Sequence, residues 1–180
     1  MFKNFDISSL KKNKPPSDNS FDTMQEVKEL KKIPLNKKFV KDNDDIESIF
    51  KKTAKKNGVD NYDKDIAAKL IKDSAPIIIE LKKHFNRPRP KDVAKKINVS
   101  MKSIEMDSMK TPSYPSGHSV QGTLIAKVLS DKYPKAASAF AKVGKNISYS
   151  RRVARAHYKS DSKFGEDIGN KMYKHVKDKM

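Results

Sequence analysis

Apolar residues recur every three or four positions along most of this chain, the spacing that places side chains on one face of a helix. Residues 21–33 and 41–56 carry this pattern among charged positions, which predicts two short amphipathic helices. In residues 62–85 the apolar positions again fall near one helical face, but Pro76 predicts a break or kink at residues 73–75. No stretch alternates apolar and polar residues long enough to predict a strand. The pattern therefore predicts an all-α fold, a single-domain helical bundle.

The C-terminal half of the chain continues the helical pattern with one clear interruption. Residues 110–117 contain Pro112 and Pro115, and two prolines so close together prevent a helix and favour turns. A tight turn is therefore expected to lead into a helix after Gly117. Before this turn, residues 91–106 show a weaker helical pattern. After it, helices are predicted from Gly117 to about Lys132, at residues 136–143, which are rich in small residues, and from about Lys159 to Val176.

The first twenty residues are polar, contain a Pro-Pro pair and lack a helical period. We expect residues 1–20 to form an N-terminal arm, disordered or draped over a domain of residues 21–180. A chain of 180 residues fits one such domain. The arm has no apolar run like that of a signal peptide, and no later stretch approaches the ~20 apolar residues of a membrane span. We therefore expect a soluble protein that is cytoplasmic or otherwise non-exported and is not integral to a membrane.

The formal net charge is +18, and most of the excess lies in residues 61–180, which also hold all four histidines. A positive field steers small phosphorylated anions toward a site, and it also attracts nucleic acid through counterion release. The chain has no tryptophan, and its aromatic residues do not interleave regularly with Lys and Arg as in a stacking platform. The charge therefore favours a small phosphorylated substrate over nucleic acid. No sequence pattern defines an oligomeric state.

Two segments contain residue types that bind phosphate. In residues 82–90, Lys82 and Arg89 are separated by six residues and a proline follows Arg89. Alone, such a cluster in a basic chain usually marks a surface patch. In the sequence Pro-Ser-Gly-His at residues 115–118, the Ser116 hydroxyl, the Gly117 amide and the positive end of the next helix can point at one anion. A plain capped turn explains this second segment equally well.

A third segment contains a candidate nucleophile. His157 follows Ser150-Arg151 after five residues, and Asp161 lies four positions further on. If a helix begins at His157, this spacing lets Asp161 hold one imidazole nitrogen and leave the other basic. Nucleophilic catalysis by histidine needs such an orienting partner. Alone, a His and an Asp four positions apart more often form a surface pair, so the interpretation depends on all three segments together.

The three segments together match, in order, the signature Lys-x6-Arg-Pro, Pro-Ser-Gly-His and Ser-Arg-x5-His-x3-Asp. Over residues 82–161 the chain resembles the superfamily of type 2 phosphatidic acid phosphatases (PAP2), class A bacterial acid phosphatases and vanadium haloperoxidases. The resemblance implies a helical bundle of the PAP2 and haloperoxidase type. Arg-Pro-Arg-Pro at residues 87–90 and glycines at positions 165 and 169 are most similar to the soluble class A enzymes. Arg155 stands where the family often has glycine, and we expect it to alter the pocket wall or contact substrate.

The resemblance assigns a role to each residue of the signature. His157 attacks the phosphorus of a small phosphomonoester and forms a phosphohistidine, while Asp161 holds its imidazole. His118 protonates the leaving alkoxide and later activates water. The remaining groups surround the phosphate oxygens: the side chains of Lys82, Arg89, Arg151 and Ser116 and the amide of Gly117. The resemblance implies no cofactor, and a chain with four histidines and no cysteine offers no convincing metal-ligand cluster.

Two alternatives to a phosphatase stay open. Vanadium-dependent haloperoxidases resemble the same pocket and hold vanadate through the histidine that corresponds to His157, although they are usually much larger proteins. A basic protein that binds nucleic acid or an anionic surface, with an inactive site, is the second alternative, and the net charge of +18 is its only support.

Overall fold

The computed structural model describes residues 1–179, which form helices joined by turns and loops, with no strand in this range. The predicted all-α fold is therefore confirmed. The α-helices are α1 (Ile7–Leu10), α2 (Phe21–Lys32), α3 (Lys37–Asp42), α4 (Ile46–Lys56), α5 (Lys64–Phe85), α6 (Pro90–Lys96), α7 (Gly117–Lys132), α8 (Ala137–Val153) and α9 (Lys159–Val176). Short 3₁₀ helices are η1 (Asp107–Lys110), η2 (Pro134–Ala136) and η3 (Lys177–Lys179).

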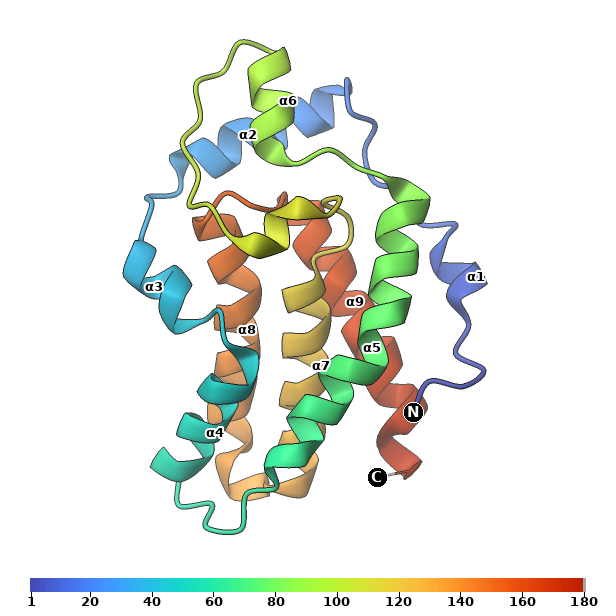
Figure 1. Cartoon of the computed structure of the whole chain (residues 1–180), viewed down its shortest axis with the longest axis vertical. Coiled ribbons are helices and arrows are strands. Elements are labelled where there is room, and N and C mark those ends of the chain that lie inside the picture. The colour runs from blue at the N-terminus through green and yellow to red at the C-terminus, as the bar shows by residue number, and fades with distance from the viewer. Residues whose placement is uncertain (180) are drawn as a thin grey trace.

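Helix α7 lies at the centre of the bundle and packs along α8 and α9, with further contacts to α4 and α5 (Figure 1). Its side chains Val120, Leu124, Ile125 and Leu129 are fully buried in the main hydrophobic core. Helices α2 and α6 lie across one end of the long helices (Figure 1). The loops that end α5, precede α7 and join α8 to α9 meet at this same end.

Glycines allow α9 to approach α7 closely. A Cβ atom on Gly165 would lie 2.7 Å from the backbone oxygen of Ser116, and one on Gly169 would lie 2.6 Å from that of Val120. Both distances are shorter than side-chain contacts in well-packed proteins, so only glycine fits at these two positions. The close approach also brings the first turns of the two helices together, where the Ser116 amide donates to the backbone oxygen of Asp161 at 3.1 Å.

Helix α5 is continuous through Pro76, so of the break or kink predicted at residues 73–75, the break is wrong. Pro76 lies on the solvent side of the helix. Leu70 before the proline and Leu81 after it are both fully buried in the core. This packing on both sides offsets the cost of about 3 kcal/mol that a proline carries inside a helix.

Three other helix boundaries differ from the predicted ones. The helix predicted at 41–56 is divided into α3 and α4, because the Asp45 side chain caps a new helix. The helix predicted at 136–143 is η2 followed by the longer α8, whose buried face continues to Val153. The helix predicted at 91–106 is the shorter α6.

Residues 1–20 lie against the bundle and include the single turn α1, which packs on α5. Phe2 and Leu10 belong to the main hydrophobic core, and the N-terminal ammonium lies 3.0 Å from the Asp73 carboxylate.

Candidate active site

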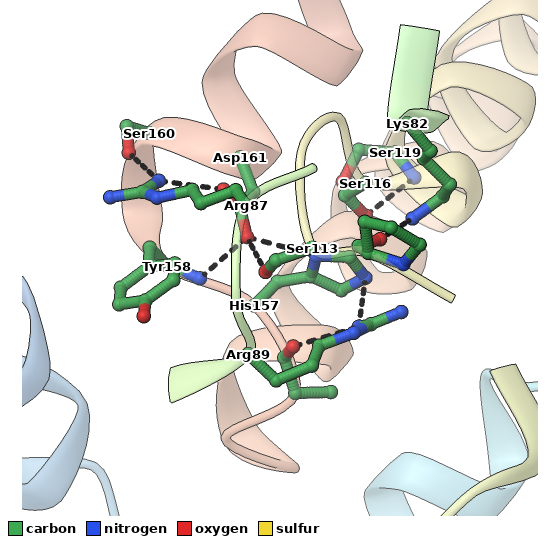
Figure 2. A network of polar contacts seen from close by, with 12 residues as sticks. Lys82, Arg87, Arg89, Ser113, Ser116, Ser119, His157, Tyr158, Ser160 and Asp161 are labelled. Carbon is green, nitrogen blue, oxygen red and sulfur yellow. Dashed lines mark hydrogen bonds and ion pairs between the residues drawn. The ribbon is translucent and has the colours of Figure 1, made fainter. Parts of the chain in front are cut away.

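The three signature segments meet at the end of the bundle that α2 and α6 cover. Figure 2 shows side chains from α5, the loop after it, the start of α7 and the start of α9 pointing toward one another. The signature residues lie as follows: Lys82 in the last turn of α5, Arg89 directly before α6, Ser116 as the N-cap of α7, Gly117 and His118 in its first turn, Arg151 in the last turn of α8, and His157 and Asp161 on either side of the start of α9.

His157 contacts Asp161, although His157 itself lies outside a helix. Helix α9 begins at Lys159, as the sequence predicts, so the condition that a helix begins at His157 is not met. Asp161 Oδ2 accepts a hydrogen bond from the Tyr158 amide at 3.1 Å, which caps the helix, and also lies 3.1 Å from His157 Nδ1. The helix cap therefore brings the imidazole and the carboxylate together.

Arg89 determines which nitrogen of His157 carries the proton. Arg89 Nη1 lies 2.9 Å from His157 Nε2, and a guanidinium can only donate (Figure 2). Nε2 therefore accepts, and the proton of the neutral ring lies on Nδ1, facing Asp161. The guanidinium is held by the backbone oxygens of Ala156, Thr111 and Ser108. The basic nitrogen of His157 is thus placed next to a fixed, buried cation.

The surroundings of His157 keep its ring neutral. Burial lowers the pKa of His157 well below its ordinary value, and the positive charges of Arg89 and Lys82 lower it further. Burial, with a smaller effect of Arg89, also lowers the pKa of Lys82 to about 7. Lys82 Nζ donates to the backbone oxygen of Pro112 at 2.6 Å. At neutral pH the site therefore combines an uncharged imidazole with cationic side chains.

Asp161 is fully buried at the centre of a hydrogen-bond network (Figure 2). Its carboxylate accepts from Arg87 Nη1 at 2.7 Å and from the Ser113 hydroxyl, in addition to Tyr158 and His157. Burial raises the pKa of Asp161, while the charge of Arg87 and these hydrogen bonds act in the opposite direction. Because every contacting group donates, the network is built around the ionised carboxylate.

Arg87 connects this network to α2. Its guanidinium lies 3.8 Å from the centre of the Tyr158 ring, and its Nη2 lies 3.1 Å from Glu26 Oε2. Glu26 also accepts from the amide and the hydroxyl of Ser160, at 2.6 and 2.7 Å. The sequence pattern does not mark Glu26, Arg87 or Ser113 as site residues. Arg87 and Ser113 lie within or beside the recognised motifs, whereas Glu26 has no local signal.

His118 and Arg151 share a partner, Asp44, from the loop between α3 and α4. Arg151 Nη1 lies 2.7 Å from Asp44 Oδ1. His118 Nε2 lies 3.1 Å from the backbone oxygen of Asp44 and 3.4 Å from its Oδ1. Asp44 also has no signal in the sequence, since it lies far from the signature in the chain. A cavity of about 720 Å³ opens beside these groups, lined by Asp44, Glu105, Met106, Asp107, Ser108, Met109, Lys110 and His118.

Ser116 and Gly117 begin α7, as the sequence predicts. The Ser116 hydroxyl oxygen accepts from the Ser119 amide at 3.3 Å and from the Ser119 hydroxyl at 2.9 Å, which fixes the side chain at the helix start. A Cβ on Gly117 would meet Ile78 at 3.4 Å, an ordinary contact, so its surroundings do not demand glycine. Its amide is among those that helix geometry leaves without an intrahelical partner.

Arg155 lies away from these residues. Its φ angle of 58° is in the left-handed region that favours glycine, which is a physical reason for glycine at this position in related proteins. The guanidinium donates to the backbone oxygens of Lys31, Ile33 and Lys102. Arg155 therefore ties the end of α2 to the loop after α6 instead of lining the pocket. Within residues 1–179, the site included, no group of three or more His, Asp or Glu side chains is arranged to hold a metal ion.

The sequence model of the PAP2 superfamily matches residues 68–172, a range that contains all three signature segments. The chain therefore belongs to the PAP2 superfamily. It is similar to the non-specific acid phosphatases of Salmonella typhimurium, with 38% identity over 88 residues, and of Salmonella typhi, with 36% identity over 88 residues. Each match covers 49% of this chain and 35% of the relative, so the matched segment is about a third of the relative's length.

The fold is similar to that of a transmembrane PAP2-type phosphatidylglycerolphosphate phosphatase from Bacillus subtilis. The TM-score is 0.63 at 16% sequence identity, and the match covers 96% of this chain and 90% of the other. At this identity the likeness concerns the fold alone. Within residues 1–179 of the present chain, every helix is too short or too polar to cross a membrane.

Proposed function

We propose that the protein is a phosphatase that hydrolyses small phosphomonoesters through a phosphohistidine on His157. The observation that carries this proposal is the state of His157: a buried, neutral imidazole with its proton held by Asp161 and its basic Nε2 beside Arg89. The similarity to proteins named non-specific acid phosphatases supports the same reaction.

In the first step, the Nε2 lone pair of His157 attacks phosphorus and the bond to the leaving oxygen breaks. The electron pair of that bond stays on the leaving oxygen, which takes a proton from His118. Asp161 stabilises the positive charge that develops on the His157 ring. The Arg89 guanidinium, which donates to Nε2 without substrate, then donates to a phosphoryl oxygen instead.

In the second step, water attacks the phosphohistidine. His118, now neutral, accepts a proton from this water, and the bond between phosphorus and Nε2 breaks to release orthophosphate. Lys82, Arg89 and Arg151 supply the positive charge that metal ions supply in many other phosphoryl-transfer enzymes. We therefore expect turnover that does not depend on an added metal.

Hydrolysis of p-nitrophenyl phosphate by the purified protein in EDTA tests this proposal. We expect turnover that vanadate inhibits and that His157→Ala abolishes. The matched control is His84→Ala, since His84 is an exposed histidine with no role in the mechanism. A burst experiment quenched in base should trap a phosphoryl group that is stable to base and labile to acid, as expected for phosphohistidine.

Unchanged turnover in His157→Ala would contradict the proposed nucleophile. Halide oxidation with added vanadate, without phosphate release, would favour the haloperoxidase alternative. A folded protein without turnover that binds DNA with steep salt dependence would favour the basic binding protein.

A further inference from the structure

Given the phosphatase mechanism above, we infer that Asp44 is a positioning residue for His118, the acid and base of that mechanism. Asp44 lies in the N-terminal part of the chain, outside residues 68–172 matched by the family model. Asp161 holds the His157 ring through Nδ1, and the structure assigns Asp44 the corresponding role of holding the His118 ring through Nε2.

The contacts of His118 determine where its protons lie. A backbone oxygen can only accept, so the hydrogen bond of 3.1 Å to Asp44 places a proton on His118 Nε2. Nδ1 is therefore the nitrogen that serves the substrate. Its proton passes to the leaving oxygen in the first step and is replaced by a proton from water in the second. Asp44 takes part in neither transfer, because Nε2 keeps its proton throughout.

The side chain of Asp44 adds a charge to this contact. Its Oδ1 lies 3.4 Å from His118 Nε2, close enough to stabilise the ring when both nitrogens are protonated, the state needed to protonate a leaving group. The hydrogen bond with His118 lowers the pKa of Asp44 to about 2; burial acts against this shift and Arg151 contributes to it. The carboxylate is therefore ionised at any pH at which the enzyme would be assayed.

Asp44 is held in place, although its side chain is 51% exposed. Arg151, which is fully buried, donates to its Oδ1 at 2.7 Å. The two neighbouring residues close the ends of the flanking helices: Asn43 donates to the Phe39 backbone oxygen at 2.8 Å, and Asp45 accepts from the Ser48 amide at 3.0 Å. Both the backbone oxygen and the carboxylate of Asp44 are thereby directed at the His118 ring.

A comparison of leaving groups distinguishes this role from a purely structural one. An alkoxide needs a proton as it leaves, whereas 2,4-dinitrophenolate does not. For Asp44→Asn we expect kcat/KM for glycerol 2-phosphate to fall about 10- to 100-fold, within the range of general acid catalysis. For 2,4-dinitrophenyl phosphate we expect a fall of less than about threefold. The ratio kcat/KM is the correct quantity, because it excludes hydrolysis of the phosphohistidine, which is the same for both esters.

Three further variants define the outcome. Asp45→Asn is the matched control, since it changes the adjacent carboxylate, keeps a good helix cap and should leave both esters unaffected. Asp44→Asn added to His118→Ala should cause no further loss with glycerol 2-phosphate, because Asp44 acts only through the proton transfer that His118→Ala already removes. Asp44→Glu, which keeps the charge, should recover part of the loss.

An equal fall for both esters would overturn the inference and make Asp44 a partner of Arg151 alone. No change for either ester would also overturn it. Asn at position 44 still offers an oxygen to Arg151, so the variant should fold, and circular dichroism checks this. Failure of the phosphatase proposal itself would appear in the wild-type protein, as absence of turnover that depends on His157.

Discussion

Three cationic side chains near His157 are buried, and burial of a charge costs free energy. Lys82, Arg89 and Arg151 are all buried, and burial lowers the pKa of each one. The consequences differ, because the pKa of Arg89 falls only to about 10, whereas that of Lys82 falls to about 7. The arginine therefore stays charged across the neutral range, and Lys82 loses its proton within it.

This difference predicts a pH dependence that belongs to Lys82. Below its pKa of about 7 the amine is charged and can bind a phosphate oxygen; above that pH it is neutral. We expect kcat/KM of the wild-type protein to decline as the pH rises through about 7. In Lys82→Arg the side chain stays charged, so the decline should move to higher pH even if the maximal rate is lower.

The measurement is kcat/KM from pH 5 to 9 for both proteins with one substrate, so that ionisation of the substrate itself is common to both. A decline at the same pH in Lys82→Arg would assign the titration to another group.

A contact between two residues can be predicted from the sequence when both residues belong to the same motif. The spacing of His157 and Asp161 correctly predicts their contact, although the contact arises from a helix cap and not from a helical turn. Glu26 and Asp44 could not be found in this way. Each contacts a site residue that lies more than 70 positions away in the sequence. In so charged a sequence, nothing in the neighbouring residues distinguishes such a carboxylate from one on the surface.

At the scale of helices, the contact between α7 and α9 controls the geometry of the site. Ser116 and Asp161 lie in the facing first turns of these helices, and Gly165 sets their separation. In Gly165→Ala the new Cβ would meet the Ser116 backbone oxygen, so the helices must move apart. We expect a loss of about 1–3 kcal/mol in the free energy of unfolding, the usual cost of overpacking, and a fall in kcat/KM.

Chemical denaturation and kinetics of the folded variant check this prediction. Asn170→Ala is the matched control, since it lies on the same helix and introduces no atoms into the contact; its unfolding free energy should change by less than about 0.5 kcal/mol. A Gly165→Ala protein as stable as the control would show that α7 and α9 can separate without cost.

The helix pattern of the sequence predicts which segments are helical better than it predicts where they end. Pro76 argues for a break in α5 on local grounds, yet the helix continues because core side chains on both sides of the proline are buried. The spacing of apolar residues within one segment does not show how that segment packs against the rest of the fold. The early end predicted for α8 has the same origin, since burial of Ile147 and Val153 against the rest of the fold extends it.

At the scale of the whole molecule, the N-terminal residues are part of both the core and the site. Leu10 is fully buried in the main hydrophobic cluster, although the sequence of the arm is mostly polar. Glu26 and Asp44 extend the site beyond the matched residues 68–172. Residues 68–172 are therefore expected to need the preceding part of the chain to form a stable site.

Leu10→Ala tests the role of the arm in the core. The substitution empties a fully buried position, which costs about 2–5 kcal/mol where the surroundings cannot collapse, and we expect a lower midpoint of thermal unfolding. Lys12→Ala changes an exposed position of the same arm and should be nearly neutral. If Leu10→Ala were equally neutral, the arm would lie on the domain without stabilising it, and residues 21–180 would fold independently of residues 1–20.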